Sequence, residues 1–171
     1  MRVISLWAGN TVVAAALVIV VFFVAAALGN LWGARLVARS LRPLGYYGRA
    51  EVASGLSALA TFIAGRWLWQ HPGAFPSGWM GQVPATLLLV GPPAFFAGIA
   101  FPSLAETFVP TADRRTASGA PFYGLNLLGA ALGVLAGSVW LPWGLGTASG
   151  FLVVTGLQIA GGLWAWRLAG Q

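Results

Sequence analysis

The stretch TVVAAALVIVVFFVAAA, from Thr11 to Ala27, contains no charged residue. It forms the centre of a longer apolar segment that we place at residues 11–36. In lipid every backbone polar group must be satisfied inside the structure, and an α-helix satisfies all of them within one segment. About 20 apolar residues are enough to cross the hydrocarbon core of a bilayer. The stretch therefore predicts a membrane-spanning helix.

Four further apolar segments follow, bounded by proline, glycine or arginine residues, and we place them at residues 47–69, 84–108, 121–141 and 149–168. They are too long for the short alternating strands of a transmembrane barrel. The third contains Gly91-Pro92-Pro93 and Pro102, and proline removes a backbone donor, so we expect this helix to be broken. The sequence predicts one all-α domain over residues 1–171, a transmembrane bundle of about five spans.

Composition supports the same class. Of the 171 residues, 58% are hydrophobic and 7% are charged, and the mean hydropathy is +0.83. A soluble domain carries about a quarter charged residues, so a soluble protein, a disordered chain and a nucleic-acid-binding protein are excluded despite the net charge of +6. The chain has no cysteine, and its one histidine, His71, has no acidic neighbour. We therefore expect no metal and no cofactor.

The arginines indicate an orientation. With five spans, seven of them fall on one side of the membrane and two, Arg2 and Arg66, on the other. Positive residues concentrate on the cytoplasmic side, so we expect the N-terminus outside and the C-terminus in the cytoplasm. Tryptophans lie near the segment ends, as in an interfacial aromatic belt. The seven arginines are Arg35, Arg39, Arg42, Arg49, Arg114, Arg115 and Arg167.

Three blocks carry a resemblance to a family. They are GNLWGARLVAR with RPL and YGRAE (residues 29–51), LVGPPAFFAGIAFP (89–102), and YGLNLLGAALG with LPWGL (123–145). In order and spacing they resemble the membrane domain of the bacterial fused major-facilitator/spermidine-synthase-like proteins, over residues 4–168. The resemblance implies a multi-pass protein of the bacterial inner membrane that is transporter-like or anchors a cytoplasmic synthase-like partner.

The chain departs from that family at two places. Family members have a further helix with an acidic residue before the first segment, and they continue into an aminopropyltransferase-like domain that binds decarboxylated S-adenosylmethionine and a polyamine. This sequence starts after that helix and stops at Gln171, where the domain would begin. We therefore expect no aminopropyl transfer and no enzyme activity from this chain. The loop signature of major-facilitator transporters is only weakly matched at residues 33–39, with Ala38 in place of its aspartate.

Two acidic residues are candidates for a site. Glu51 matches an acidic position of the family, and an ionisable group at membrane depth suggests a proton or cation site. The alternative is an interfacial ion pair of Glu51 with Arg35 or Arg49. Glu106 is expected at headgroup level, where it pairs with Arg114 or Arg115.

Three other features are polar or unwound at membrane depth. Pro92 and Pro93 free backbone carbonyls, and transporters use such broken helices for substrate and ion sites, although a packing kink is the alternative. Asn126 shares a helix face with Tyr123 and is expected to bond to a neighbouring helix or to contact a ligand. Gln158 is also expected to bond to a neighbouring helix.

Small residues line several predicted helices. Gly129, Gly133 and Gly137 form two overlapping Gly-x-x-x-Gly motifs, which favour close helix contact. Gly29 with Gly33, and the face that starts at Ser54, are similar. We expect these faces to pack within the chain, with a homodimer as the alternative. A second function therefore stays open beside the family reading, namely a non-catalytic accessory subunit packed against other membrane subunits.

Overall fold

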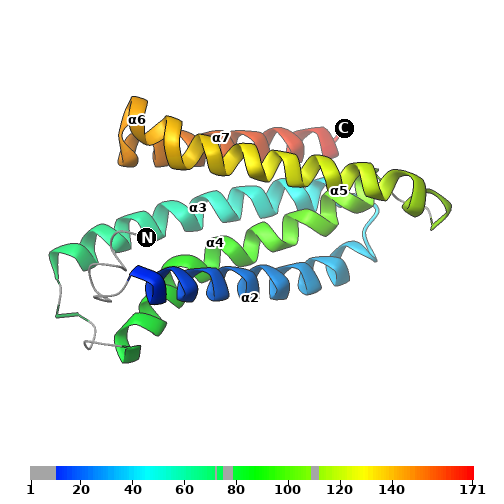
Figure 1. Ribbon diagram of the computed structural model, residues 1–171. Coiled ribbons are helices and arrows are strands. Elements are labelled where there is room, and N and C mark those ends of the chain that lie inside the picture. The colour runs from blue at the N-terminus through cyan, green and yellow to red at the C-terminus, as the bar shows by residue number, and fades with distance from the viewer. Residues whose placement is uncertain (1–10, 72, 75–78, 109–111) are drawn as a thin grey trace.

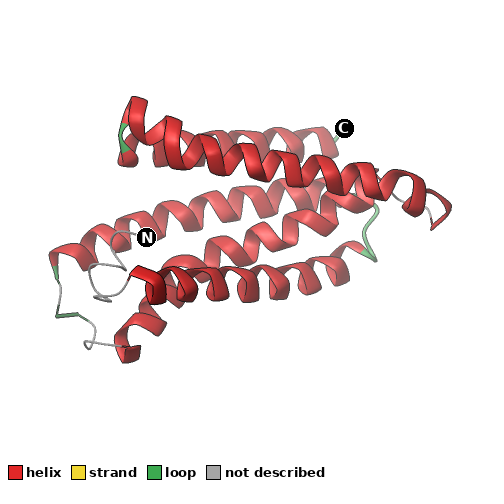
Figure 2. Cartoon of the chain, viewed as in Figure 1, coloured by secondary structure: helices red, strands yellow, loops and turns green. Residues whose placement is uncertain are grey.

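The computed structural model describes residues 11–71, 73–74, 79–108 and 112–171, and these residues contain helices and no strand. The helices are α2 (Thr11–Val37), α3 (Pro43–Gln70), α4 (Trp79–Phe108), α5 (Ala112–Leu135), the π-helix η1 (Ala136–Trp140), α6 (Leu141–Leu145) and α7 (Thr147–Ala169). Figure 2 shows that loops are short between them. The five long segments predicted from the sequence are all helical, so the all-α class is confirmed.

Four of the helices lie side by side in an order that differs from the chain order. The main contacts join α2 to α4, α4 to α3, and α3 to α7 (Figure 1). Buried Ala50 of α3 packs against Ile99 and Ala100 of α4, with Phe95 beside them. The result is a layer of helices with α4 and α3 at its centre and with α5 lying along the outside of the bundle.

Glycines set the distance between neighbouring helices. A Cβ on Gly29 would overlap the carbonyl oxygen of Phe95, and a Cβ on Gly98 would overlap that of Ala26, so α2 and α4 touch through their backbones. On the other side of the layer, a Cβ on Gly48 of α3 would lie 2.6 Å from the amide nitrogen of Trp166 in α7. Such small-residue contacts drive helix association in membranes, where packing replaces the hydrophobic effect. The predicted packing face of α2 is confirmed.

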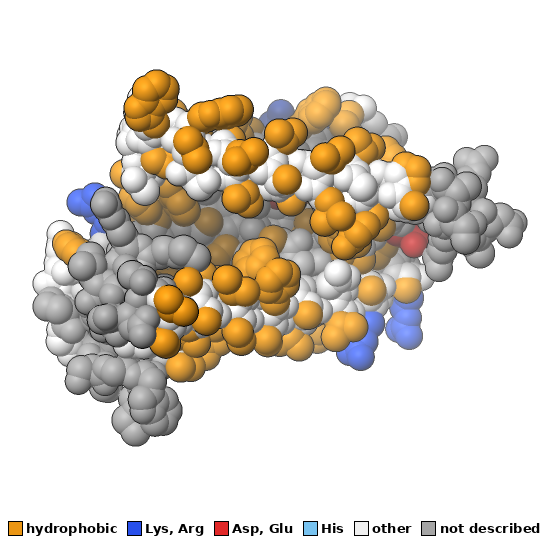
Figure 3. Space-filling view, viewed as in Figure 1, with side chains coloured by type: hydrophobic (Ala, Val, Ile, Leu, Met, Phe, Trp, Pro, Cys, Tyr) orange, Lys and Arg blue, Asp and Glu red, His pale blue; other side chains and the backbone are white. Residues whose placement is uncertain are grey.

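Among the residues that the structure describes, four helices are long and apolar enough to cross a bilayer. They cover Val12–Val37, Gly81–Phe108, Gly119–Leu145 and Thr147–Ala169, with mean hydropathies between 3.0 and 1.4. Figure 3 shows apolar side chains spread over α5 and α2 on the face turned toward the viewer. The chain is therefore a membrane protein. The helix α3 has 28 residues but carries Arg49, Glu51 and Arg66 and is not among the four.

The predicted break in the third segment is absent. Helix α4 runs without interruption from Trp79 to Phe108, with four prolines inside it, at positions 84, 92, 93 and 102. Proline fixes φ near the helical value, so it can stay in a helix when the carbonyls it frees are tolerated. Hydroxyl groups supply additional bonds along α4, because Thr86 and Ser103 donate to the carbonyls of Gln82 and Ile99 at 2.7 and 2.9 Å. The four prolines are therefore accommodated within one continuous helix.

The α5 segment is longer than predicted and contains a π-turn. The helix starts at Ala112 and continues through η1 and α6 to Leu145, beyond the expected residues 121–141. Pro142 cannot donate a backbone hydrogen bond. In the turn before it, the N–H of Leu141 donates to the carbonyl of Ala136, five residues back. Through the π-turn, the helix continues past Pro142 to Leu145.

One glycine joins α6 to α7. Gly146 has φ 77° and ψ 159°, and no other described residue has a positive φ. This backbone region is accessible essentially to glycine alone. Its freedom allows the chain to reverse within a single residue.

We therefore expect Gly146→Ala to lower the free energy of unfolding by about 1–3 kcal/mol, because a Cβ strains that conformation. The measurement is a thermal unfolding curve in detergent, followed by tryptophan fluorescence. Gly156→Ala is the matched control, because Gly156 is helical and a Cβ there meets nothing within 4 Å. A Gly146→Ala protein as stable as this control would contradict the expectation.

The glycine motifs of α5 and η1 pack against none of the described residues. A Cβ on Gly129, Gly133 or Gly137 would meet no atom within 4 Å. The spanning window of this helix has no buried residue, whereas the window of α4 is 33% buried. The expectation of intramolecular packing for this face is therefore wrong for the described part of the chain. Instead, α5 contacts α4 through aromatic rings, with Phe101 and Phe122 at a centroid distance of 5.8 Å.

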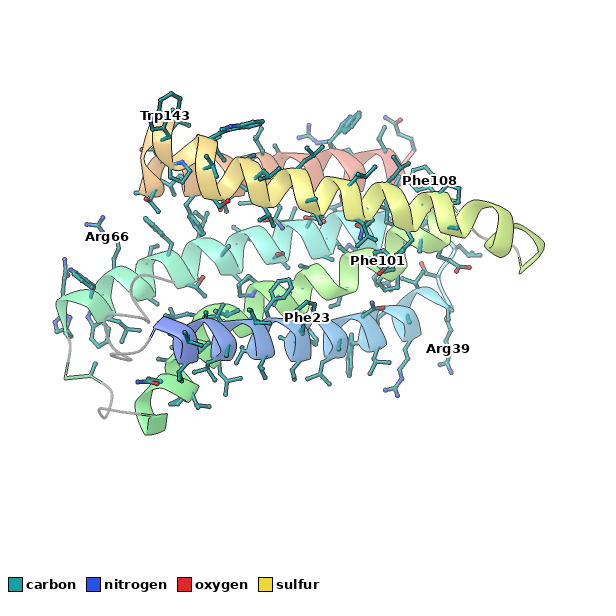
Figure 4. The ribbon with its side chains drawn as sticks, viewed as in Figure 1. Phe23, Arg39, Arg66, Phe101, Phe108 and Trp143 are labelled. Atoms are coloured by element: carbon teal, nitrogen blue, oxygen red, sulfur yellow. The ribbon has the colours of Figure 1, made fainter. Side chains whose placement is uncertain are left out.

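The described arginines divide between the two ends of the bundle. Arg39 and Arg66 lie at opposite ends (Figure 4). The start of α3 and the end of α7 share the end of Arg39, because a Cβ on Gly45 would lie 3.4 Å from Ala169. Trp143 lies at the other end and is 90% exposed. The helices therefore separate an arginine-rich end from an end with tryptophans and a single described arginine.

Candidate functional site

A polar cluster joins three helices inside the layer. The side-chain nitrogen Nε2 of Gln158 in α7 lies 2.9 Å from Oε2 of Glu51 and 3.1 Å from Oγ of Ser54, both in α3. The hydroxyl of Ser54 donates to the carbonyl oxygen of Pro93 in α4 at 3.0 Å. Tyr47, one turn before Glu51, also hydrogen-bonds to its carboxylate. We refer to Tyr47, Glu51, Ser54, Pro93 and Gln158 as the Glu51 cluster.

Local sequence explains how these groups meet. Ser54 and Gly55 follow Glu51 by three and four residues, so both lie on the face of α3 that carries Glu51. A Cβ on Gly55 would lie 2.5 Å from the side chain of Ile159, and a Cβ on Gly162 would lie 2.9 Å from that of Glu51. The glycines bring α7 close enough for Gln158 to reach α3. The predicted interhelical bond of Gln158 is confirmed.

The ion pair considered for Glu51 is not formed in the described part of the structure. Neither Arg35 nor Arg49 bonds to its carboxylate, whose partners are Gln158 and Tyr47. The guanidinium of Arg49 lies instead over the rings of Tyr46 and Trp166, at 5.9 and 5.4 Å from their centroids. Helix α3 begins at Pro43, so Glu51 lies about two turns into it rather than one. A carboxyl group is thus held among neutral partners.

Of the two prolines, only Pro93 joins the cluster, through its carbonyl. That oxygen accepts the Ser54 hydroxyl, while no hydrogen bond of Pro92 to another helix is seen among the described residues. Ser54 itself is 3% exposed, and its own carbonyl accepts the hydroxyl of Ser57 at 2.8 Å. Within the double proline, Pro93 is therefore the residue through which α4 is hydrogen-bonded to α3.

A second polar region lies between α2, α4 and α5. A cavity of about 430 Å³ is lined by Asn30, Tyr123 and Asn126 together with apolar side chains. Of the apolar side chains that line it, Phe23 comes from α2 and Phe101 from α4 (Figure 4). Asn126 and Tyr123 were both expected as candidates, and the structure brings them together. Asn30 was missed, although an amide in an otherwise apolar segment was a usable signal.

A neighbouring cavity of about 480 Å³ extends this region toward the arginine-rich end. Glu106 lines it, together with Asn30 and Tyr123. The expected partners of Glu106, Arg114 and Arg115, have side chains outside the described residues, so this pairing stays a prediction. We call the two adjoining cavities the α2–α5 groove. The groove and the Glu51 cluster lie on different sides of α4, since α2 and α3 flank that helix.

The described histidine and acidic residues give no metal site. Among the described residues, no group of three histidine, cysteine or acidic side chains is placed to hold a metal ion. The ring nitrogen Nδ1 of His71 lies 2.9 Å from the carbonyl oxygen of Trp67, and the two rings stack at 4.5 Å. His71 is thus bound to its own helix end.

The chain was also compared with known proteins. No protein-family model, curated protein or solved structure matches it. The resemblance to the spermidine-synthase-like fusion proteins therefore stays a prediction, and the functional argument rests on the geometry of the chain.

Proposed function

We propose that the chain is a transporter-like membrane domain, similar to the membrane part of the spermidine-synthase-like fusion proteins, in which Glu51 binds a proton or a cation. The observation that carries this proposal is the bond between Glu51 and Gln158. It holds a carboxyl group between helices with amide, hydroxyl and phenol partners. Ionisable residues within membrane helices are expensive, and they mark ion pathways and proton relays.

The chemistry of the cluster supports a coupling role. A charged carboxylate only accepts hydrogen bonds, and it accepts one from the amide of Gln158. A protonated carboxyl also donates one hydrogen bond, and the amide of Gln158 can accept it by turning to present its oxygen. Binding of a proton therefore changes the contact between α3 and α7. Ser54 extends the change to α4, since it contacts both Gln158 and the Pro93 carbonyl.

The α2–α5 groove is the proposed substrate path. Its amide and phenol groups, from Asn30, Tyr123 and Asn126, suit a polar organic substrate at membrane depth. The resemblance suggests a polyamine, whose ammonium groups would be accepted by amide oxygens and aromatic faces.

A second candidate function is supported by a different observation. The face of Gly129, Gly133 and Gly137 contacts nothing in the described chain. An unoccupied small-residue face is suited to another helix. This face supports an accessory subunit, or the anchor of a cytoplasmic synthase-like partner, as the second candidate function.

Both candidates require the same topology, and it is directly testable. If α3 spans the membrane as the fifth helix, the arginine-rich end lies in the cytoplasm of a bacterial inner membrane. We expect a reporter fused at Gln171 to be active in the cytoplasm. A reporter inserted near Gly73 is expected to be active in the periplasm. A periplasmic signal from the fusion at Gln171 would overturn this orientation.

Uptake by reconstituted protein tests the transporter proposal. We expect liposomes that contain the chain to accumulate radiolabelled spermidine when a pH gradient is imposed, because proton binding is coupled to helix movement. A protonophore is expected to abolish the accumulation, and empty liposomes provide the background. Uptake at background with an intact gradient would reject polyamine transport. Recovery of the chain in a fixed-stoichiometry complex with other membrane subunits would then support the accessory function.

A further inference from the structure

A separate pocket lies at the arginine-rich end, between the turn that joins α2 to α3 and the end of α7. It has a volume of about 320 Å³. The turn contributes Ser40, Leu41 and Arg42, the first turns of α3 contribute Arg49, and α7 contributes Trp166. Ligand pockets commonly have volumes of about 300–1,000 Å³, so the space is sufficient for a small group.

The charge of this pocket is not balanced by the protein. Arg42 and Arg49 both line it, and neither forms an ion pair with a carboxylate among the residues that the structure describes. Glu51, the nearest acid along α3, is bonded to Gln158 and Tyr47. The start of α3 and the end of α7 contribute partial charges of about +0.5 and −0.5, which cancel. Two full positive charges therefore remain.

The aromatic side chains hold one of these charges in place. Arg49 lies over both Tyr46 and Trp166, at 5.9 and 5.4 Å from the ring centroids. Stacking uses the face of the guanidinium and leaves its N–H edge for an acceptor. That planar edge matches the oxygens of a phosphate, which arginine binds in a bidentate manner. Beside it, the hydroxyl of Ser40 accepts the backbone N–H of Arg42 at 3.0 Å and so orders the turn.

We propose that this pocket binds a phosphate group through Arg42 and Arg49. Basic pockets between helix ends recognise anionic lipid headgroups. An anionic phospholipid is the source that the surroundings favour, because Leu41 is 100% exposed and Trp166 is 46% exposed beside the arginines. These side chains place apolar contacts for acyl chains next to the charged group. Free phosphate is the other source of the same chemistry, and the site is independent of the Glu51 cluster.

The test uses the full chain in mixed detergent micelles. Native mass spectrometry measures its affinity for phosphatidylglycerol and for phosphatidylcholine, and thermal unfolding measures the effect of inorganic phosphate without lipid. We expect tighter binding of phosphatidylglycerol, and a roughly tenfold weaker affinity in Arg42→Gln and in Arg49→Gln, because each loses a charge-assisted hydrogen bond. Both side chains are exposed, so neither substitution disturbs the core. Added salt should weaken the binding.

Arg66→Gln is the matched control, since Arg66 lies at the opposite end of the bundle (Figure 4), and it should bind phosphatidylglycerol as the wild type does. Stabilisation by inorganic phosphate that both pocket variants lose, without selective lipid binding, would support the pocket and assign free phosphate as its source. The proposal is overturned if the pocket variants bind both probes as the control does.

Discussion

Replacing Glu51 with glutamine is expected to reduce proton-coupled uptake to the level of empty liposomes. Glutamine keeps the volume of the side chain, and its oxygen still accepts the N–H of Gln158, so the contact between α3 and α7 survives. What disappears is the ionisable group that we propose binds a proton or a cation. The measurement is spermidine accumulation under an imposed pH gradient.

The control for this variant is Arg66→Gln, which removes an exposed charge from the same helix α3 and lies outside both the Glu51 cluster and the α2–α5 groove. It should retain wild-type uptake if coupling resides in the Glu51 cluster. Unfolding curves of both variants check that each protein is folded. Wild-type uptake by a folded Glu51→Gln protein would remove the ion-site hypothesis, whatever the substrate.

Replacing Gly98 with alanine is expected to separate α2 from α4. The added Cβ would overlap the carbonyl oxygen of Ala26, and a backbone group cannot rotate away as a side chain does. Overpacking that forces the backbone to move costs about 1–3 kcal/mol. Because van der Waals packing drives helix association in lipid, the loss of this contact lowers the free energy of unfolding. The measurement is unfolding in detergent by titration with a denaturing surfactant, followed by circular dichroism.

Gly91 supplies the matched control in the same helix. A Cβ there meets nothing within 4 Å, and alanine is a better helix former by about 0.5–1 kcal/mol, so Gly91→Ala should be neutral or slightly stabilising. Gly29→Ala should repeat the Gly98 result from the other side, since its Cβ would overlap the carbonyl of Phe95. Equal stability of the Gly98 and Gly91 variants would refute the close contact.

The helices themselves were predictable, because long uncharged runs leave the backbone no alternative in lipid. The ends of α2 and α7 agree with the prediction within a residue or two. The predicted break at Pro92 and Pro93 is wrong. A proline in the sequence indicates a lost backbone donor, but it does not indicate whether neighbouring groups tolerate that loss. The start of α5 was missed since residues 112–120 are polar, and helix formation does not require apolar residues.

The candidate site was predictable only in parts. Glu51 and Gln158 were each identified as polar residues in apolar surroundings, but they are 107 residues apart in the chain. Nothing in their local sequence reveals that α3 packs on α7. Gly48 and Gly162 carry that information, yet a glycine also occurs where a helix faces open space, as at Gly129. Only the arrangement of the helices distinguishes the two cases.

The order of contacts in the layer has a consequence for biogenesis. Helices enter the bilayer in chain order, yet α2 packs on α4, and α3 needs both α4 and α7. After its insertion, α2 therefore lacks its main packing partner until α4 has also been inserted. The carboxyl group of Glu51 gains its amide partner only when α7 has been inserted. The Glu51 cluster is thus complete only once α7 is in place, so a partly inserted chain lacks it.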